Sequence, residues 1–68
     1  MTMMLHEALG LLGVSTINGS PQQLLKLCVW IEDLSKSNGK EWIAENREVL
    51  LKQWDYILLQ EQGKNRNR

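Results

Sequence analysis

The 68-residue sequence contains no phenylalanine and only one cysteine, one proline and one histidine. A single cysteine excludes an internal disulfide, and so few cysteines and histidines exclude the clusters that hold structural zinc. The formal net charge is zero, so no overall field attracts nucleic acid or anionic lipid. A domain this small is near the lower limit for folding on a hydrophobic core alone. Without a disulfide or a structural metal, self-association is the remaining way to stabilise so small a domain.

Long apolar runs are also missing. The longest, Leu27 to Ile31, is far shorter than the roughly 20 residues that a membrane span needs. The first residues lack the basic segment that opens a secretory signal, and a lone free cysteine is typical of a reducing compartment. We therefore expect a cytoplasmic protein that is not embedded in a membrane.

Helix start and stop signals divide the chain into three predicted helices. Thr2 is the expected cap of a first helix over about residues 2–12, and Gly13 is its expected end. The segment Ser20–Gln23 then combines a serine N-cap, a proline at the first helical position and a glutamine at the third. This strongest start signal in the sequence predicts a second helix over about residues 21–36.

A short break at residues 37–39 precedes the third predicted helix, over about residues 40–62. Asn38 and Glu41 predict a capping box at its start, and Gly63 is its expected end. Because the connection is so short, the second and third helices should be antiparallel neighbours. The predicted fold is all-α, a short N-terminal helix followed by an antiparallel αα-hairpin, in one domain over residues 1–62. Residues 63–68 should form a frayed basic tail.

The third predicted helix carries two apolar stripes, whereas a helix in a small monomer needs only one. At about 100° per residue, one face presents a core stripe of Ile43, Leu50, Trp54 and Ile57. A separate line consists of Trp42, Val49 and Tyr56, spaced seven residues apart. This second line must be covered either by the first helix or by another chain.

The third predicted helix is also longer than the second, at roughly 34 Å against roughly 24 Å. Its overhanging residues 56–59 are apolar or aromatic, and the second helix can cover them only in part. We therefore expect a homodimer, completed by an interface formed by Trp42, Val49, Tyr56 and Leu59. Leu25 and Val29 form a smaller apolar patch on the second helix.

No group of residues in the sequence has the spacing of a catalytic or metal site. His6 lies on the predicted polar face of the first helix without a second ligand, and Cys28 lies in an apolar stripe without a neighbouring base. Arg47 falls on the core side of its helix, where it either extends to water or pairs with Glu32, with Asp33 or with a carboxylate of a partner. We expect no catalytic residue, no cofactor and no metal.

Two features bear on nucleic-acid binding. The segment from Leu9 to Ser15 is similar to the turn of a helix-turn-helix motif. A recognition helix starting there would be broken at Gly19 and Pro21, and no lysine or arginine precedes Lys26 to contact phosphate. The remaining feature is a set of basic tail residues: Lys64, Arg66 and Arg68.

The predicted function is a small non-enzymatic protein–protein interaction module. It would act as a regulatory or adaptor subunit that binds itself and a further protein. The alternative is a small nucleic-acid-associated regulator that uses the basic C-terminal tail. The two functions differ in what the chain should bind at physiological salt.

We expect no measurable binding to duplex DNA or single-stranded RNA at about 150 mM salt, where phosphate-driven binding is already weakened. Fluorescence anisotropy with labelled oligonucleotides measures this. Micromolar binding that disappears when residues 64–68 are deleted would favour the nucleic-acid alternative instead.

Overall fold

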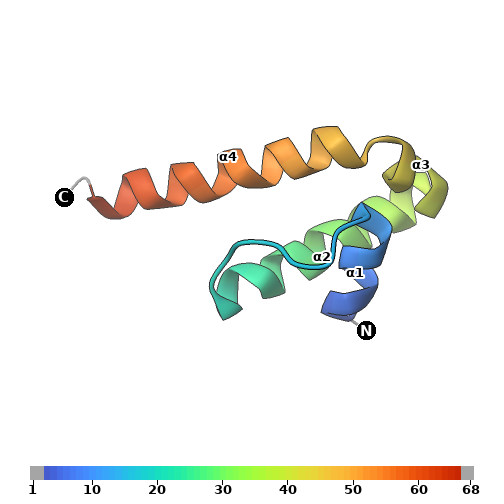
Figure 1. Ribbon diagram of the computed structural model, residues 1–68, viewed down its shortest axis with the longest axis horizontal. Helices are drawn as coiled ribbons and strands as arrows, with labels where there is room; N and C mark the ends of the chain where they lie inside the picture. The colour runs from blue at the N-terminus through green and yellow to red at the C-terminus, as the bar shows by residue number, and fades with distance from the viewer. Residues whose placement is uncertain (1–2, 67–68) are drawn as a thin grey trace.

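The computed structural model describes residues 3–66, with side chains described for residues 3–61. These residues form an all-α fold, as predicted, with no strand in the described range. Its helices are α1 (Leu5–Leu12), α2 (Pro21–Asn38), α3 (Lys40–Glu45) and α4 (Arg47–Arg66). Figure 1 shows α4 along one side of the molecule, with α1, α2 and α3 all on its other side. The shape is elongated, with extents of 40 × 24 × 23 Å.

The first helix ends at the predicted residue. Gly13 has φ 73° and ψ 27°, a left-handed conformation, and its N–H donates to the carbonyl of Gly10. The next N–H, of Val14, donates to the carbonyl of Leu9, so both bonds satisfy carbonyls at the end of α1. The start differs from the prediction, because α1 begins at Leu5 after Met4 rather than near residue 2. The predicted cap, Thr2, lies outside the described residues.

The capping box that opens α2 is present as predicted. Ser20 Oγ accepts from the backbone N–H of Gln23 at 3.2 Å, and Gln23 Oε1 accepts from the backbone N–H of Ser20 at 2.8 Å. Pro21 occupies the first helical position, where its missing N–H leaves no hydrogen bond unmade. The helix continues to Asn38, two residues beyond its predicted end at 36.

The single helix predicted over residues 40–62 is wrong, because the chain breaks at Asn46 into α3 and α4. Asn46 Nδ2 donates to the carbonyl of Trp42 at 2.8 Å, and Arg47 Nη1 donates to the carbonyl of Ala44 at 2.8 Å. Side chains thus satisfy carbonyls at the end of α3, and the Asn46 carbonyl accepts the first bond of α4 from Leu50. The helix is interrupted with its polar groups paired.

Two other predicted helix ends also differ. The Asn38–Glu41 capping box does not form, because Asn38 is the last residue of α2 and Gly39 stands at the N-cap of α3. Gly39 has φ 94°, which favours glycine, and it offers no side-chain cap. At the other end, the backbone of α4 passes through Gly63 to Arg66, so helix occupies part of the predicted tail. Residues 67–68 lie outside the described part.

All four helices contribute to one core. Its fully or nearly fully buried side chains are Ala8, Leu12, Leu27, Ile31, Ile43, Leu50 and Trp54. The indole of Trp54 stacks on that of Trp30 in α2, with ring centroids 6.3 Å apart. Trp54 Nε1 also donates to the carbonyl of Asn18 at 2.9 Å, which fixes the connector between α1 and α2 against α4.

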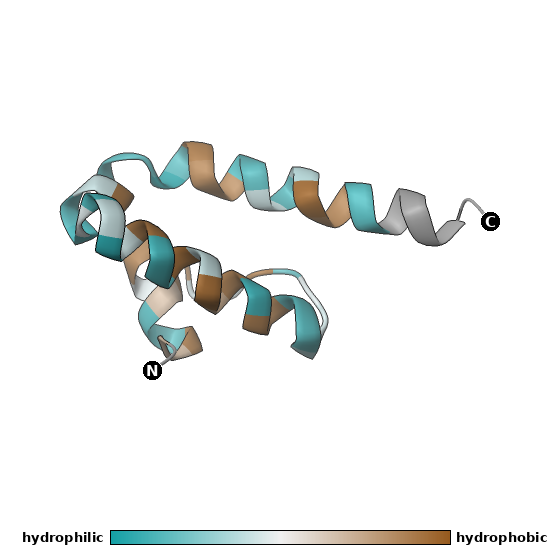
Figure 2. Ribbon diagram, turned by 180° about the vertical axis from the view of Figure 1, so that it is seen from behind, coloured by the Kyte–Doolittle hydropathy of each residue, from teal (hydrophilic) through white to brown (hydrophobic). Residues whose placement is uncertain are grey.

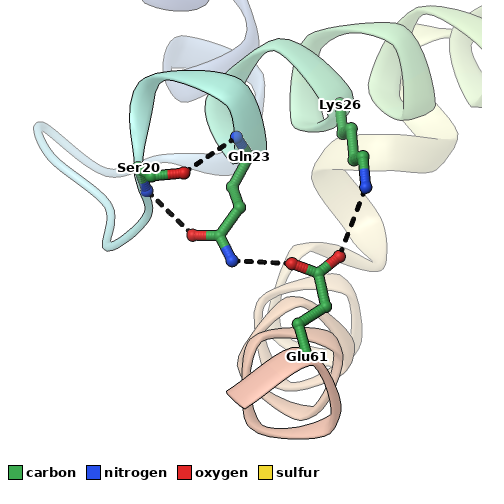
Figure 3. Close-up of polar contacts among 4 residues, drawn as sticks. All are labelled: Ser20, Gln23, Lys26 and Glu61. Carbon is green, nitrogen blue, oxygen red and sulfur yellow. Dashed lines mark hydrogen bonds and ion pairs between the residues drawn. The ribbon is translucent and has the colours of Figure 1, made fainter. Parts of the chain in front are cut away.

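A polar contact joins the start of α2 to the far part of α4 (Figure 3). Glu61 Oε1 accepts from Gln23 Nε2 at 2.7 Å, and Glu61 Oε2 lies 3.5 Å from Lys26 Nζ. Gln23 is also the glutamine of the capping box, so one side chain serves both the helix start and the contact to α4. These contacts therefore hold α2 and α4 together at the end of the molecule that lies opposite α3.

Leu50 and Val49 are neighbours in the sequence, but Leu50 is 4% exposed and Val49 is 56% exposed. Leu50→Ala should lower the free energy of unfolding by about 2–5 kcal/mol, enough to unfold much of so small a domain. Val49→Ala should change it by less than about 0.5 kcal/mol. Urea denaturation followed by circular dichroism, at a low concentration that keeps the chains apart, measures both. Equal losses would contradict this packing.

Candidate interaction surface

The outer face of α4 carries large apolar side chains that no described part of the chain covers. Val49, Tyr56 and Leu59 are 56%, 62% and 65% exposed. At 100° per residue they lie opposite Trp54, which is buried. Lys52 is exposed and lies among them. We define the outer face of α4 as Val49, Lys52, Tyr56 and Leu59.

A second apolar area lies on α2. Leu25 and Val29 are 60% and 45% exposed, one helical turn apart. Together with Lys26, half-buried Trp30 and Asp33, they line a shallow groove of about 480 Å³. We call Leu25, Val29 and Trp30 the α2 patch. Figure 2 shows that apolar segments alternate with polar ones along both α2 and α4.

The structure separates Trp42 from the other predicted interface residues. Trp42 is half-buried and packs against the core, whereas Val49, Tyr56 and Leu59 are exposed. The cause is the break at Asn46, since the seven-residue spacing holds a line only within one continuous helix. Trp42 is therefore a core-packing residue of α3, and the predicted line reduces to its part on α4.

The first helix does not cover this line either. It packs against α2, α3 and α4 and leaves both Val49 and Tyr56 more than half exposed. The overhanging residues 56–59 of α4 are covered in part by the core and by the connector between α1 and α2. Ile57 and Leu58 are half-buried against the core, and Leu58 lines a small hollow together with Asn18 of the connector. The connector, rather than α1, covers this stretch of α4.

The side chain of Arg47 is exposed, and its aliphatic part lies beside Gly13 at the end of α1. A Cβ atom at Gly13 would lie 3.2 Å from Arg47 Cδ, so the two residues are in close contact. The guanidinium of Arg47 donates to the Ala44 carbonyl. Its predicted partner Glu32 instead accepts from the Met3 N–H at 3.0 Å and pairs with Lys36 at 3.6 Å. Arg47 thus terminates α3 rather than pairing with α2.

Three residues on or near this surface were not predicted from the sequence. Asn46 breaks the helix, Glu61 ties α4 to α2, and Lys52 sits within the apolar outer face. An asparagine inside a helical pattern is the available signal for the first, because its side chain competes for backbone hydrogen bonds. Lys52 was identifiable from its spacing between Val49 and Tyr56.

Other candidate residues are scattered. His6 is exposed on α1, whereas Cys28 is 6% exposed inside α2. Among the described residues, no group of three or more His, Cys, Asp or Glu side chains is placed to hold a metal ion. In the same range, no helix has the length and apolar content to cross a bilayer. The side chains of Lys64, Arg66 and Arg68 lie outside the described residues.

No family model matches this sequence, and comparison with curated proteins and with solved structures likewise finds no match.

Burial raises the pKa of the Cys28 thiol above its usual value, and a backbone hydrogen bond lowers it to a smaller extent. The folded protein should therefore react with Ellman's reagent at mildly alkaline pH many-fold more slowly than the urea-unfolded chain. Because folding raises the pKa of Cys28, the protonated thiol contributes its whole share of the folding free energy below the ordinary pKa of cysteine. This contribution is lost as the pH rises through the raised pKa. Equal labelling rates in the two states would contradict this burial.

Proposed function

We propose that this protein is a small non-enzymatic interaction module, a regulatory or adaptor subunit, that forms a homodimer through the outer face of α4. The observation that carries the proposal is the exposure of Val49, Tyr56 and Leu59 on one face of a continuous helix. Single exposed apolar residues are ordinary on protein surfaces. Three large ones aligned along one helix are typical of a surface that another chain covers.

The energetics limit the affinity that the exposed side chains can give a dimer. Full burial of a large apolar side chain contributes about 1.5–3 kcal/mol, and each copy offers three such side chains that are about 60% exposed. Association costs roughly 4–15 kcal/mol in lost freedom. The two quantities are similar in size, so a micromolar dimer, which needs a net gain of about 8 kcal/mol, requires further contacts beyond these three side chains.

The small size of the domain supports the same proposal. Among the residues whose side chains are described, the core cluster contains seven well-buried apolar side chains. Small domains of this kind commonly gain stability from oligomerisation when they have no disulfide or metal. The single cysteine is buried and free, which suits the cytoplasmic location that we propose.

At tens of micromolar, light scattering coupled to size exclusion should give twice the chain mass of 7.9 kDa. The double substitution Val49→Glu with Tyr56→Lys should reduce the mass to that of one chain and leave a helical spectrum, because both side chains are exposed in the single chain. The matched control, Leu25→Glu with Val29→Lys, alters the α2 patch in the same way and should leave the dimer intact.

A chain that stays monomeric throughout the column would contradict the proposed dimer. If the α4 variant lost its helicity as completely as Leu50→Ala, the outer face would be part of the core. A dimer that is split by the α2 variant and not by the α4 variant would place the interface on Leu25 and Val29.

A further inference from the structure

We propose that the α4 helices of the two copies pair antiparallel, with their crossing point at Trp54. In this pairing Val49 packs against Leu59 of the second copy, and Lys52 packs beside Tyr56 of the second copy. The inference rests on the proposed homodimer and adds to it the orientation and register of its subunits.

The spacing of the outer face supports a helix–helix seam. Val49, Lys52, Tyr56 and Leu59 follow intervals of three, four and three residues, which is the spacing of alternating a and d positions in a coiled coil. Trp54 and Glu61 then fall on the opposite side of the helix, where both contact the rest of the domain. One side of α4 thus binds its own domain and the other is free for a second helix.

The order of these residues fits an antiparallel partner. The spacing is symmetric about Trp54, so in an antiparallel pair centred there the apolar ends, Val49 and Leu59, meet each other. The same register places Lys52 opposite Tyr56. A two-fold axis generates each contact twice, which is the closed arrangement that a homodimer requires.

The charge of Lys52 distinguishes the two possible orientations. A parallel pair in register would place Lys52 against Lys52 of the second copy in the middle of an apolar seam, and like charges repel more strongly as they lose water. The antiparallel pair sets the two ammonium groups apart, each against the ring of Tyr56, which attracts a cation.

Asp55 adds to this preference. Lys52 and Asp55 are both exposed and lie on the same flank of α4. In an antiparallel pair related by a two-fold axis, like flanks of the two helices lie on the same side. Asp55 of the second copy therefore lies beside Lys52, so opposite charges meet at the rim of the seam.

Disulfide trapping in a Cys28→Ala background tests the orientation. Val49→Cys and Leu59→Cys are prepared separately, checked for dimer mass by light scattering, and oxidised alone and as an equimolar mixture. In the antiparallel pair, equivalent Val49 positions lie about 15 Å apart along the helix axis, too far for a disulfide. The mixture should therefore form covalent dimers about tenfold faster than either variant alone, because Val49 and Leu59 positions fall within disulfide range. Leu25→Cys on the α2 patch serves as the control for random collision.

The outcomes separate this inference from the proposed dimer. A mass of one chain for all variants and for the unsubstituted protein would overturn the proposed dimer itself. A dimer in which Val49→Cys alone is trapped as fast as the mixture would overturn the antiparallel orientation and indicate a parallel pair. A dimer trapped no faster than the Leu25→Cys control would show that α4 does not pair with α4, including the case in which α4 docks on the α2 groove.

A second variant tests the role assigned to Lys52. Lys52→Leu removes the repulsion that opposes the parallel pair and leaves the apolar seam intact. Trapping of Val49→Cys with itself should then increase several-fold relative to the chain that retains Lys52. No increase would show that the charge of Lys52 does not set the orientation.

Discussion

Trp54 is the side chain on which the arrangement of this small fold depends. It is 2% exposed, stacks on Trp30 of α2 and donates its indole N–H to the Asn18 carbonyl in the connector. One residue of α4 therefore holds both a helix and a loop in place. An indole combines a large apolar surface with one hydrogen-bond donor, so it can be buried without an unpaired polar group. The rest of the core packs around this junction.

The sequence predicted the elements whose signals are local. The Ser20–Gln23 capping box and the end of α1 at Gly13 depend on a few adjacent residues, and both are found in the structure. The burial of Leu50 and Trp54 followed from helical periodicity alone. These predictions succeeded because the backbone and the side-chain pattern favour the same structure.

The predictions that failed depend on competition between side chain and backbone. Asn46 lies inside an otherwise regular helical pattern. Its side-chain amide and its backbone N–H both donate to the Trp42 carbonyl. The resulting break changes the direction of the helix and brings Trp42 to the core. The Gln23–Glu61 contact joins residues 38 positions apart, and sequence spacing carries no signal for such a pair. The sequence therefore indicated the exposed apolar residues of α4, but it did not indicate that Trp42 of α3 packs against the core.

The Gln23–Glu61 contact couples the opening of two segments that are distant in the sequence. Gln23 holds the first turn of α2 through the capping box and also donates to Glu61 near the far end of α4. Fraying of α4 past this point would remove this acceptor from the Gln23 amide, and unwinding of the first turn of α2 would remove this donor from Glu61 Oε1. Proteins open locally in cooperative units, and a hydrogen bond between two segments raises the free energy of opening either of them. The start of α2 and the far part of α4 are thus coupled, although α3 joins these two helices at the opposite end of the molecule.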